Sequence, residues 1–166
     1  MSIIYQYSRP LGDVRSLEDA SKKLQDGSNA AYSLEAKYVS KEELLKEADF
    51  VSLNLPYTPE VRHLIGAAEL KMMKSSAYLI NTARGAHVDE EALVEALKRG
   101  EIAGAAMDVY EQEPQITPEL LELDNVVLSP HTGTGTWEGR IAMCENVCDN
   151  ILAWEKQDFN KMNIVL

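Results

Sequence analysis

Three short segments of this 166-residue chain place ionisable side chains directly after apolar runs. LINTARGA carries Arg84, DVYEQEP carries Glu111 and Glu113, and SPHTG carries His131. Guanidinium is a planar fork that fits a carboxylate or phosphate, and an imidazole near a carboxylate can move a proton. Arg84, Glu113 and His131 together predict a catalytic site for an anionic substrate. The plainer alternative is a surface arginine, solvated acids and a structural histidine.

Other ionisable residues near these segments have simpler interpretations. Asp108 lies near the end of its apolar run, where an acid needs a partner and can serve as a cap or turn residue. His63 and His87, the other two histidines of the chain, lie in polar sequence contexts and are predicted to be incidental.

The two cysteines, Cys144 and Cys148, are four residues apart in a helical pattern. This spacing predicts two buried thiols on one helix face. A disulfide or a metal site is not expected, because no histidine or further cysteine completes a tetrahedral set nearby. The low cysteine content predicts a reducing, cytoplasmic setting.

The composition limits the partners that the chain can bind. It is 45% hydrophobic and 26% charged, which is ordinary for a globular domain, and its net charge is -11. So acidic a chain is not expected to bind nucleic acid or an anionic membrane through its overall electrostatic field. No apolar run approaches the roughly 20 residues that span a bilayer, and the first residues do not resemble a signal peptide.

Apolar runs and helical patterns alternate along the chain. Strands are predicted within residues 3–7, 37–39, 49–56, 78–81, 102–110 and 125–131. Helices are predicted within residues 16–25, 40–49, 59–74, 88–100, 116–124 and 136–156. Ser40 and Asp89 have the type and position of helix N-caps, and Gly100 is placed to end a helix.

Continuous apolar strands that alternate with helices predict a parallel sheet covered on both faces, in one α/β domain. In such sheets ligands bind outside the carboxyl ends of the strands. The sequence therefore predicts that Arg84, Glu113 and His131 meet at one edge of the sheet.

The last predicted helix carries a broad apolar surface. Its main stripe consists of Trp137, Ile141, Cys144, Cys148 and Ile151, which Met143, Val147 and Trp154 widen. Two interpretations are open: burial against a partner or second domain, or packing on the chain's own sheet.

LINTARGAHVDEEALVEALKRGEIAGAAMDVYEQEP, followed by LDNVVLSPHTGTGTWEGR, strongly resembles the D-isomer-specific 2-hydroxyacid dehydrogenases. ADFVSLNLPYTPEVRHLIG resembles the segment that precedes them in that family, so the resemblance covers residues 38–154. PHTGTGT is most similar to fungal glyoxylate, hydroxypyruvate or mandelate-type reductases. The resemblance implies a Rossmann-like, doubly wound α/β fold. It also implies an NAD(P)-dependent oxidoreductase that reduces small 2-oxo acids such as glyoxylate or hydroxypyruvate.

The resemblance also implies roles for single residues. Arg84 matches the arginine that holds the substrate carboxylate and keto group, and His131 matches the acid/base that protonates the carbonyl oxygen. Glu113 matches the glutamate that pairs with this histidine, and a nearby carboxylate favours the protonated imidazole. The matching cofactor-binding residues are Leu55, Pro56, Thr82, Ala83, Asp108 and Gly133.

The first residues of the chain are similar to the family's second strand and the loop after it. In the complete fold an acid in that loop binds the adenosine ribose and selects NAD. Here Ser8 and Arg9 occupy the region, and they suit a 2′-phosphate. NADP is therefore slightly favoured over NAD, with Arg9 as an ordinary turn residue the alternative.

The family's phosphate-binding G-x-G-x-x-G motif is missing from this sequence. Gly133 and Gly135 belong to the histidine segment and do not form it. The chain is therefore predicted to be a single partial NAD(P)-binding domain, 1–166, that lacks the first strand, the phosphate loop and the substrate domain. Residues 136–166 would pack on the absent substrate domain or on a partner.

Loss of the first, central strand would leave a strand edge unpaired. The chain is expected to close the gap by moving its own first strand, or to associate as a homodimer or with a homologous chain. Three functions stay open: a 2-oxo acid reductase, an inactive remnant that acts by association with a full-length relative, and a residual nucleotide-binding module.

Overall fold

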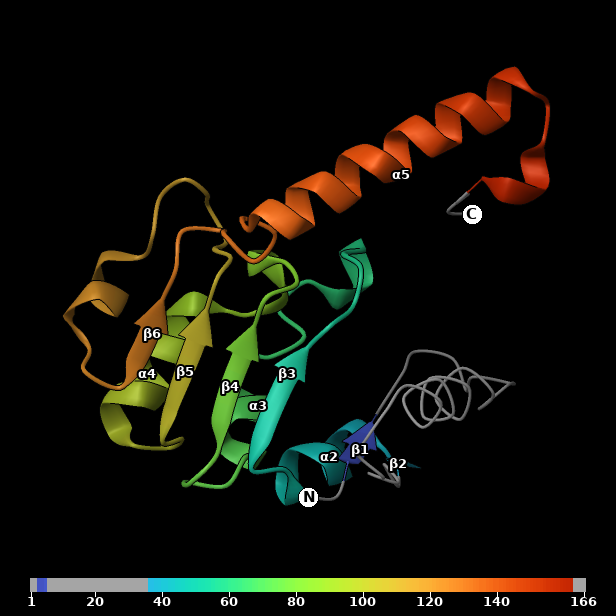
Figure 1. Ribbon diagram of the computed structural model, residues 1–166. Helices are drawn as coiled ribbons and strands as arrows, with labels where there is room; N and C mark the ends of the chain where they lie inside the picture. Colours follow the sequence, from blue (N-terminus) through green and yellow to red (C-terminus); the bar gives the residue numbers. More distant parts are fainter. Residues whose placement is uncertain (1–2, 6–35, 163–166) are drawn as a thin grey trace, which may run out of the picture.

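The computed structural model describes residues 3–5 and 36–162 of the chain, and Figure 1 shows its elements. With η for a 3₁₀ helix, these are β1 (Ile3–Tyr5), β2 (Ala36–Tyr38), α2 (Lys41–Glu47), β3 (Phe50–Leu53), η1 (Pro59–Val61), α3 (Ala67–Met72), β4 (Tyr78–Asn81), η2 (Gly85–His87), α4 (Glu90–Arg99), β5 (Gly104–Met107), η3 (Pro118–Glu122), β6 (Val126–Leu128), α5 (Trp137–Glu155) and η4 (Phe159–Lys161). The helix predicted within 16–25 lies outside the described residues.

Four parallel strands form the main sheet, in the order β3-β4-β5-β6. Ile80 in β4 lies opposite Ser52 in β3 and Ala106 in β5. Because the order follows the sequence and every pair is parallel, all four strands end at the same edge (Figure 1). This edge carries the segments that the sequence singled out. The fold class is the predicted α/β arrangement.

One face of this sheet is covered, and the other is exposed in the described part of the chain. Val51, Leu53 and Leu79 are buried in a core with residues of α3 and α4, which lie behind the sheet in Figure 1. Alternate residues of the strands point the other way, and Phe50 is 64% exposed and stacked on Tyr78. Cover on both faces was predicted, and the described residues supply it on one.

The predicted helix ends are confirmed by their caps. The Ser40 hydroxyl accepts a hydrogen bond from the amide of Glu43, and a carboxylate oxygen of Asp89 accepts one from the amide of Ala92. Gly100 ends α4 with a φ of 66°, a left-handed conformation that glycine adopts without strain. The predicted helix within 116–124 is the 3₁₀ helix η3.

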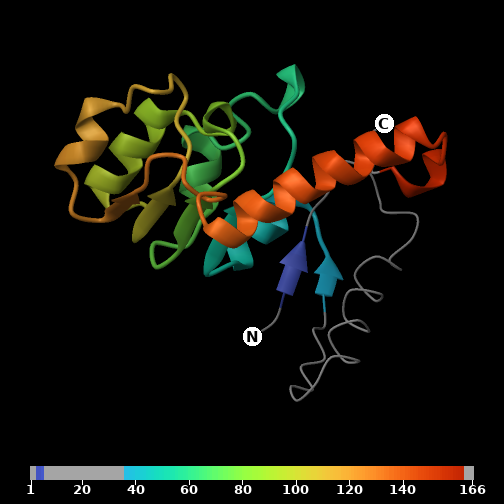
Figure 2. The ribbon, with the colours of Figure 1, turned by 45° about the horizontal axis from the view of Figure 1, so that its top comes forward.

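The first two strands form a separate sheet. β1 and β2 pair in parallel, with Ile4 opposite Lys37, and Figure 2 shows the pair set apart from the four-stranded sheet. Within the described residues β3 pairs with β4 alone, so its other edge has no strand partner. The expectation that the chain closes this gap by moving its own first strand is therefore wrong.

Helix α5 projects away from the sheet instead of packing on it (Figures 1 and 2). Trp137 is 82% exposed, and within α5 Ala153 is the buried residue. The interpretation that this helix packs on its own sheet is wrong. So is the prediction of buried thiols, because Cys144 and Cys148 are both exposed and free. No helix in the described ranges has the length and apolar character that crossing a membrane requires.

Candidate active site

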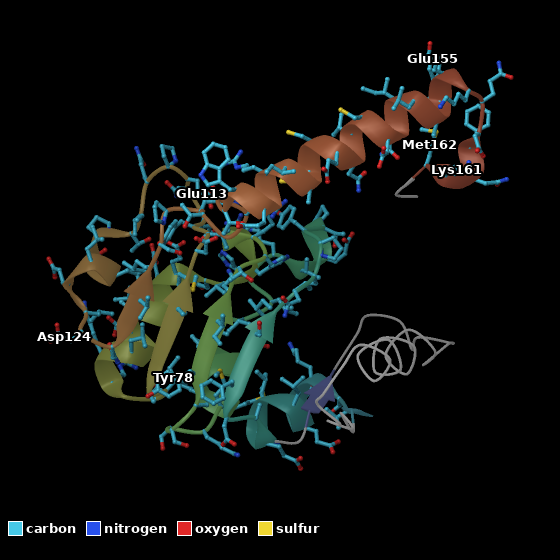
Figure 3. The ribbon with its side chains drawn as sticks, in the orientation of Figure 1. Tyr78, Glu113, Asp124, Glu155, Lys161 and Met162 are labelled. Atoms are coloured by element: carbon cyan, nitrogen blue, oxygen red, sulfur yellow. The ribbon has the colours of Figure 1, made fainter. Side chains whose placement is uncertain are left out.

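Three loops leave the carboxyl ends of β4, β5 and β6 and carry Arg84, Glu113 and His131 respectively. Figure 3 shows Glu113 at this end of the sheet, near the start of α5, and Tyr78 at the opposite end. The sheet thus brings together residues that are up to 47 positions apart in the sequence, since 131 minus 84 is 47. The predicted clustering at this edge is confirmed by the topology.

The loop that carries Arg84 is held by the buried side chain of Asn81. The Asn81 amide nitrogen donates to the carbonyl of Arg84 at 2.9 Å, and its oxygen accepts from the amide of Ala83 at 3.1 Å. Sequence reasoning missed this residue. The available signal was an asparagine at the last position of an apolar strand, because a buried polar group there must find hydrogen-bond partners.

Arg84 itself is exposed. Its guanidinium donates to the carbonyl of Ala83 at 2.6 Å, and it makes no ion pair in the part of the chain that the structure describes. Most of its fork is therefore available for an anion.

Gly85 packs directly against the loop of Glu113. A Cβ atom added to Gly85 would lie 1.9 Å from the carbonyl carbon of Tyr110 and 2.4 Å from the amide nitrogen of Glu111. Only glycine permits this approach, which places Arg84 beside the loop of Glu113. The glycine after Arg84 is therefore part of the site's construction.

The Tyr110 hydroxyl joins the second loop to the third. It donates to the carbonyls of Met107 at 3.1 Å and Ser129 at 2.8 Å. Burial raises the pKa of Tyr110 above its ordinary value, and the charge of Asp108 adds to the effect. The phenol therefore stays protonated and remains a donor at neutral pH.

Glu113 and His131 form a hydrogen-bonded pair. A carboxylate oxygen of Glu113 lies 2.8 Å from Nδ1 of His131, and the other accepts from the amide of Tyr110 at 3.0 Å. The hydrogen bond with His131 is the largest cause that lowers the pKa of Glu113; burial opposes it, and the Tyr110 amide and the charges of His131 and Arg84 add to it. Glu113 is thus a carboxylate at neutral pH.

The other ring nitrogen of His131 faces no protein partner among the described residues, and its side chain is 51% exposed. With Nδ1 engaged by Glu113, Nε2 is free to exchange a proton with a bound molecule. This is the arrangement that general acid–base chemistry needs.

Asp108 fixes the backbone that carries His131. One of its oxygens accepts from the amide of Thr132 at 2.8 Å and from the Ser129 hydroxyl, and the other accepts from the amide of Gly133 at 2.8 Å. These bonds hold His131 at a φ of 53°, which non-glycine residues rarely adopt. Burial by itself would raise the pKa of Asp108, but the hydrogen bonds and the charge of His131 outweigh it and lower that pKa.

An open pocket of about 400 Å³ lies beside Arg84. It is lined by Asn54, Leu55, Pro56, Tyr57, Thr82, Ala83 and Arg84. Four of the predicted cofactor-binding residues thus surround one hollow next to the predicted substrate arginine. Gly133 belongs instead to the His131 loop and donates its amide to Asp108, and Ser8 and Arg9 lie outside the described residues.

The other two histidines differ from the prediction that both are incidental and polar. His87 is fully buried, and neither ring nitrogen makes a hydrogen bond. Burial lowers its pKa, with the backbone of Pro56 opposing, so the ring is neutral. His63 is in a polar setting, but its Nε2 lies 2.7 Å from a carboxylate oxygen of Glu111. His63 therefore ties a neighbouring loop to the segment that carries Glu113.

The described residues contain no group of three histidine, cysteine, aspartate or glutamate side chains that could hold a metal ion. The side chains at this edge can bind an anion through Arg84 and transfer a proton through the Glu113–His131 pair.

Comparison with known proteins identifies the family. The profile described as "D-isomer specific 2-hydroxyacid dehydrogenase, NAD binding domain" matches residues 19–133. The chain belongs to this family. The match includes the segments of Arg84, Glu113 and His131, and it stops two residues beyond the histidine.

Individual relatives agree with the family match. The chain is 55% identical over 121 residues to a glyoxylate reductase of Thermococcus litoralis, an alignment that covers 73% of this chain and 37% of that protein. Its structure is similar to that of a glyoxylate reductase from Paecilomyes thermophila, with a TM-score of 0.75, 42% identity and coverage of 92% of this chain and 42% of the other.

A D-mandelate dehydrogenase from Rhodotorula graminis, in its holo form, is similar with a TM-score of 0.76 and 33% identity. The alignment covers 92% of this chain and 40% of that one. The chain thus spans less than half the length of each of these relatives.

The lowered pKa of Glu113 predicts a pH-dependent loss of stability. A carboxyl whose pKa is below its ordinary value of 4.5 when folded contributes stability that is complete above pH 4.5 and is lost as the pH falls through the lowered value. His131→Asn removes the imidazole that hydrogen-bonds with Glu113 and keeps a residue that tolerates positive φ. We expect this variant to be less stable than the wild type near neutral pH, with a difference that shrinks in acid.

Urea unfolding followed between pH 7 and pH 3 measures this difference. The control is the same substitution in a Glu113→Gln background, where the pH-dependent part should vanish. A stability difference that is constant with pH would show that the pair is not coupled in this way.

Proposed function

We propose that this chain supplies the substrate and proton-transfer residues of an NAD(P)-dependent reductase of small 2-oxo acids such as glyoxylate or hydroxypyruvate. The observation that carries the proposal is the Glu113–His131 hydrogen bond at the edge where the exposed Arg84 also lies. Glyoxylate is favoured because relatives with 55% and 42% identity carry the name glyoxylate reductase.

The geometry supports separate roles for Arg84 and His131 at the substrate. Arg84 binds the carboxylate and keto oxygen through its fork, and its loop is fixed by Asn81. Nε2 of the protonated His131 gives its proton to the carbonyl oxygen, while Glu113 holds Nδ1–H and stabilises the positive ring. The carbonyl carbon would receive its hydride from a nicotinamide bound beside Arg84. The product is the 2-hydroxy acid, and His131 is left neutral.

The residues present fit part of the cofactor. Thr82 and Ala83 line the pocket beside Arg84, where they would hold the nicotinamide and its ribose, and Leu55 and Pro56 line the same pocket from the loop that would lie beside the adenosine half. The sequence has no G-x-G-x-x-G loop, so no backbone cradle for the pyrophosphate comes from these 166 residues. We therefore expect turnover near zero for the chain by itself.

Carboxylate binding by Arg84 can be tested without turnover. Oxamate, an unreactive analogue of a 2-oxo acid, is titrated into the labelled chain, and the NMR resonances of the His131 ring and the Arg84 guanidinium are followed. Arg84→Gln removes charge-assisted hydrogen bonds worth about 1.5–3 kcal/mol, so affinity should fall about 10- to 100-fold. Arg140→Gln, on the exposed helix α5, is the matched control. Equal affinities for both variants would contradict the role of Arg84.

Within the proposed function, NADP is slightly favoured over NAD. The basis is the pair Ser8 and Arg9, which can bind a 2′-phosphate where the family's NAD-specific acid would stand. We expect NADPH to bind more tightly than NADH, with nicotinamide fluorescence and melting temperature both rising with ligand. Arg9→Ala should remove the preference. Tighter binding of NADH would reverse the assignment, and no binding up to millimolar cofactor would favour the non-catalytic alternative.

A second candidate function is association with another chain of the same kind. Its basis is the apolar surface of α5, where Trp137, Ile141, Met143, Val147, Ile151 and Trp154 are all between 51% and 82% exposed. Such a surface is costly to leave in water and is typical of a protein interface. We propose that it forms a homodimer or binds a homologous chain.

Charge placed on this surface should break the association. Ile141→Glu is expected to give a monomer by size exclusion with light scattering, because it puts a carboxylate into the apolar contact. Ala142→Glu adds the same charge about 100° around the helix and should leave the assembly intact. A wild-type chain that stays monomeric, both by itself and mixed with a complete homologue, would contradict the proposal.

A further inference from the structure

Glu113 lies in a segment that has little internal support. We call residues 109–117 the acid loop; it connects β5 to η3. Inside it the amide of Gln115 donates to the carbonyl of Gln112 and the amide of Tyr110 donates to the Glu113 carboxylate, both at 3.0 Å, but neither bond fixes the loop on the sheet. Since the carboxylate of Glu113 must meet His131 at 2.8 Å, the two ends of this loop have to be held from outside.

Glu90 contacts both ends of the acid loop. It is the first residue of α4 and is 4% exposed. One of its carboxylate oxygens accepts from the amide of Glu111 at 2.6 Å, and the other accepts from the Thr117 hydroxyl. We propose that Glu90 is a positioning residue that fixes the acid loop and thereby orients Glu113 on His131.

The burial of Glu90 needs a reason, because a carboxylate out of water is costly. It makes no ion pair within the described ranges, so hydrogen bonds must offset the cost. The amide of Glu111 and the hydroxyl of Thr117 supply them, and the N-terminus of α4 adds a favourable field. A carboxylate has two acceptor oxygens, one for each of these two donors. A glutamine of the same shape has one acceptor and would turn an NH₂ group toward a donor.

The rest of the acid loop is held at the same point. Gly85 packs on the Tyr110–Glu111 peptide, while Arg62 and His63 hold the Glu111 side chain at 2.5 and 2.7 Å. These contacts hold the Glu111 end of the loop and do not include Thr117. Glu90 is the described residue that hydrogen-bonds with both ends, so its loss should loosen the whole segment, Glu113 included.

This inference rests on the proposed role of Glu113 and His131, but its readout needs neither substrate nor turnover. The pKa of Glu113 is lowered chiefly by its hydrogen bond with His131, so it reports whether the pair is intact. A residue that merely stabilised α4 would leave this pKa unchanged. If oxamate fails to bind while the pKa of Glu113 still responds to Glu90, the proposed function is wrong and the positioning is right.

The experiment compares Glu90→Gln with Glu91→Gln. Both remove one negative charge from the first turn of α4, but Glu91 is exposed and has no contact with the acid loop among the described residues. The carboxyl carbon of Glu113 is followed by NMR against pH in the ¹³C-labelled chain. In Glu90→Gln its pKa should rise toward the ordinary value of 4.5, and in Glu91→Gln it should match the wild type.

Two milder variants guard against loss of the fold. Thr117→Val removes one donor to Glu90 and keeps the shape, and Thr117→Ser restores the hydroxyl. The valine variant should raise the pKa of Glu113, and the serine variant should return it to the wild-type value. An unchanged pKa in both Glu90→Gln and Thr117→Val would overturn the inference. So would an equal rise in Glu91→Gln, because charge and not position would then be the cause.

Discussion

At the carboxyl-terminal edge of the sheet, Asn81 and Asp108 are buried and their polar groups need hydrogen-bond partners; the site follows from that pairing. Asn81 ends β4 and Asp108 follows β5, and both are at most 7% exposed. The Asn81 side-chain amide hydrogen-bonds with the Arg84 loop, and the Asp108 carboxylate accepts hydrogen bonds from the His131 loop. The exposed side chains at this edge are therefore positioned by side chains that are themselves buried.

Some parts of the chain are held in place by such contacts, whereas others keep exposed surfaces. Glu113, His131 and Arg84 sit on loops that are tied to each other by Gly85, by Tyr110 and by Glu90. In contrast, most of α5 is exposed, and the outer edge of β3 has no strand partner among the described residues. A chain that spans 37% of a related glyoxylate reductase thus has the hydrogen-bonded Glu113–His131 pair beside surfaces suited to further contacts.

Much of the local structure followed from residue types. The caps Ser40 and Asp89 and the stop at Gly100 were predictable because side-chain and backbone chemistry act within four residues. Burial was harder. Cys144 and Cys148 have the spacing of one helix face, but spacing does not say whether anything covers that face, and here nothing described does. His87 showed the reverse, a polar sequence context with a fully buried ring.

Residue types and motif order were enough to predict the family, the parallel α/β class and Arg84, Glu113 and His131 as candidate site residues, whose strand ends in such a sheet share an edge. The contacts that hold those residues could be read from the folded structure alone. For Asn81 and Asp108 the sequence indicates that a partner is needed but not which one, and Glu90 has the sequence context of a solvated helix residue. Their partners are up to 27 positions away, at Thr117 for Glu90. Pairing over that distance depends on which loops meet, and that is a property of the folded sheet.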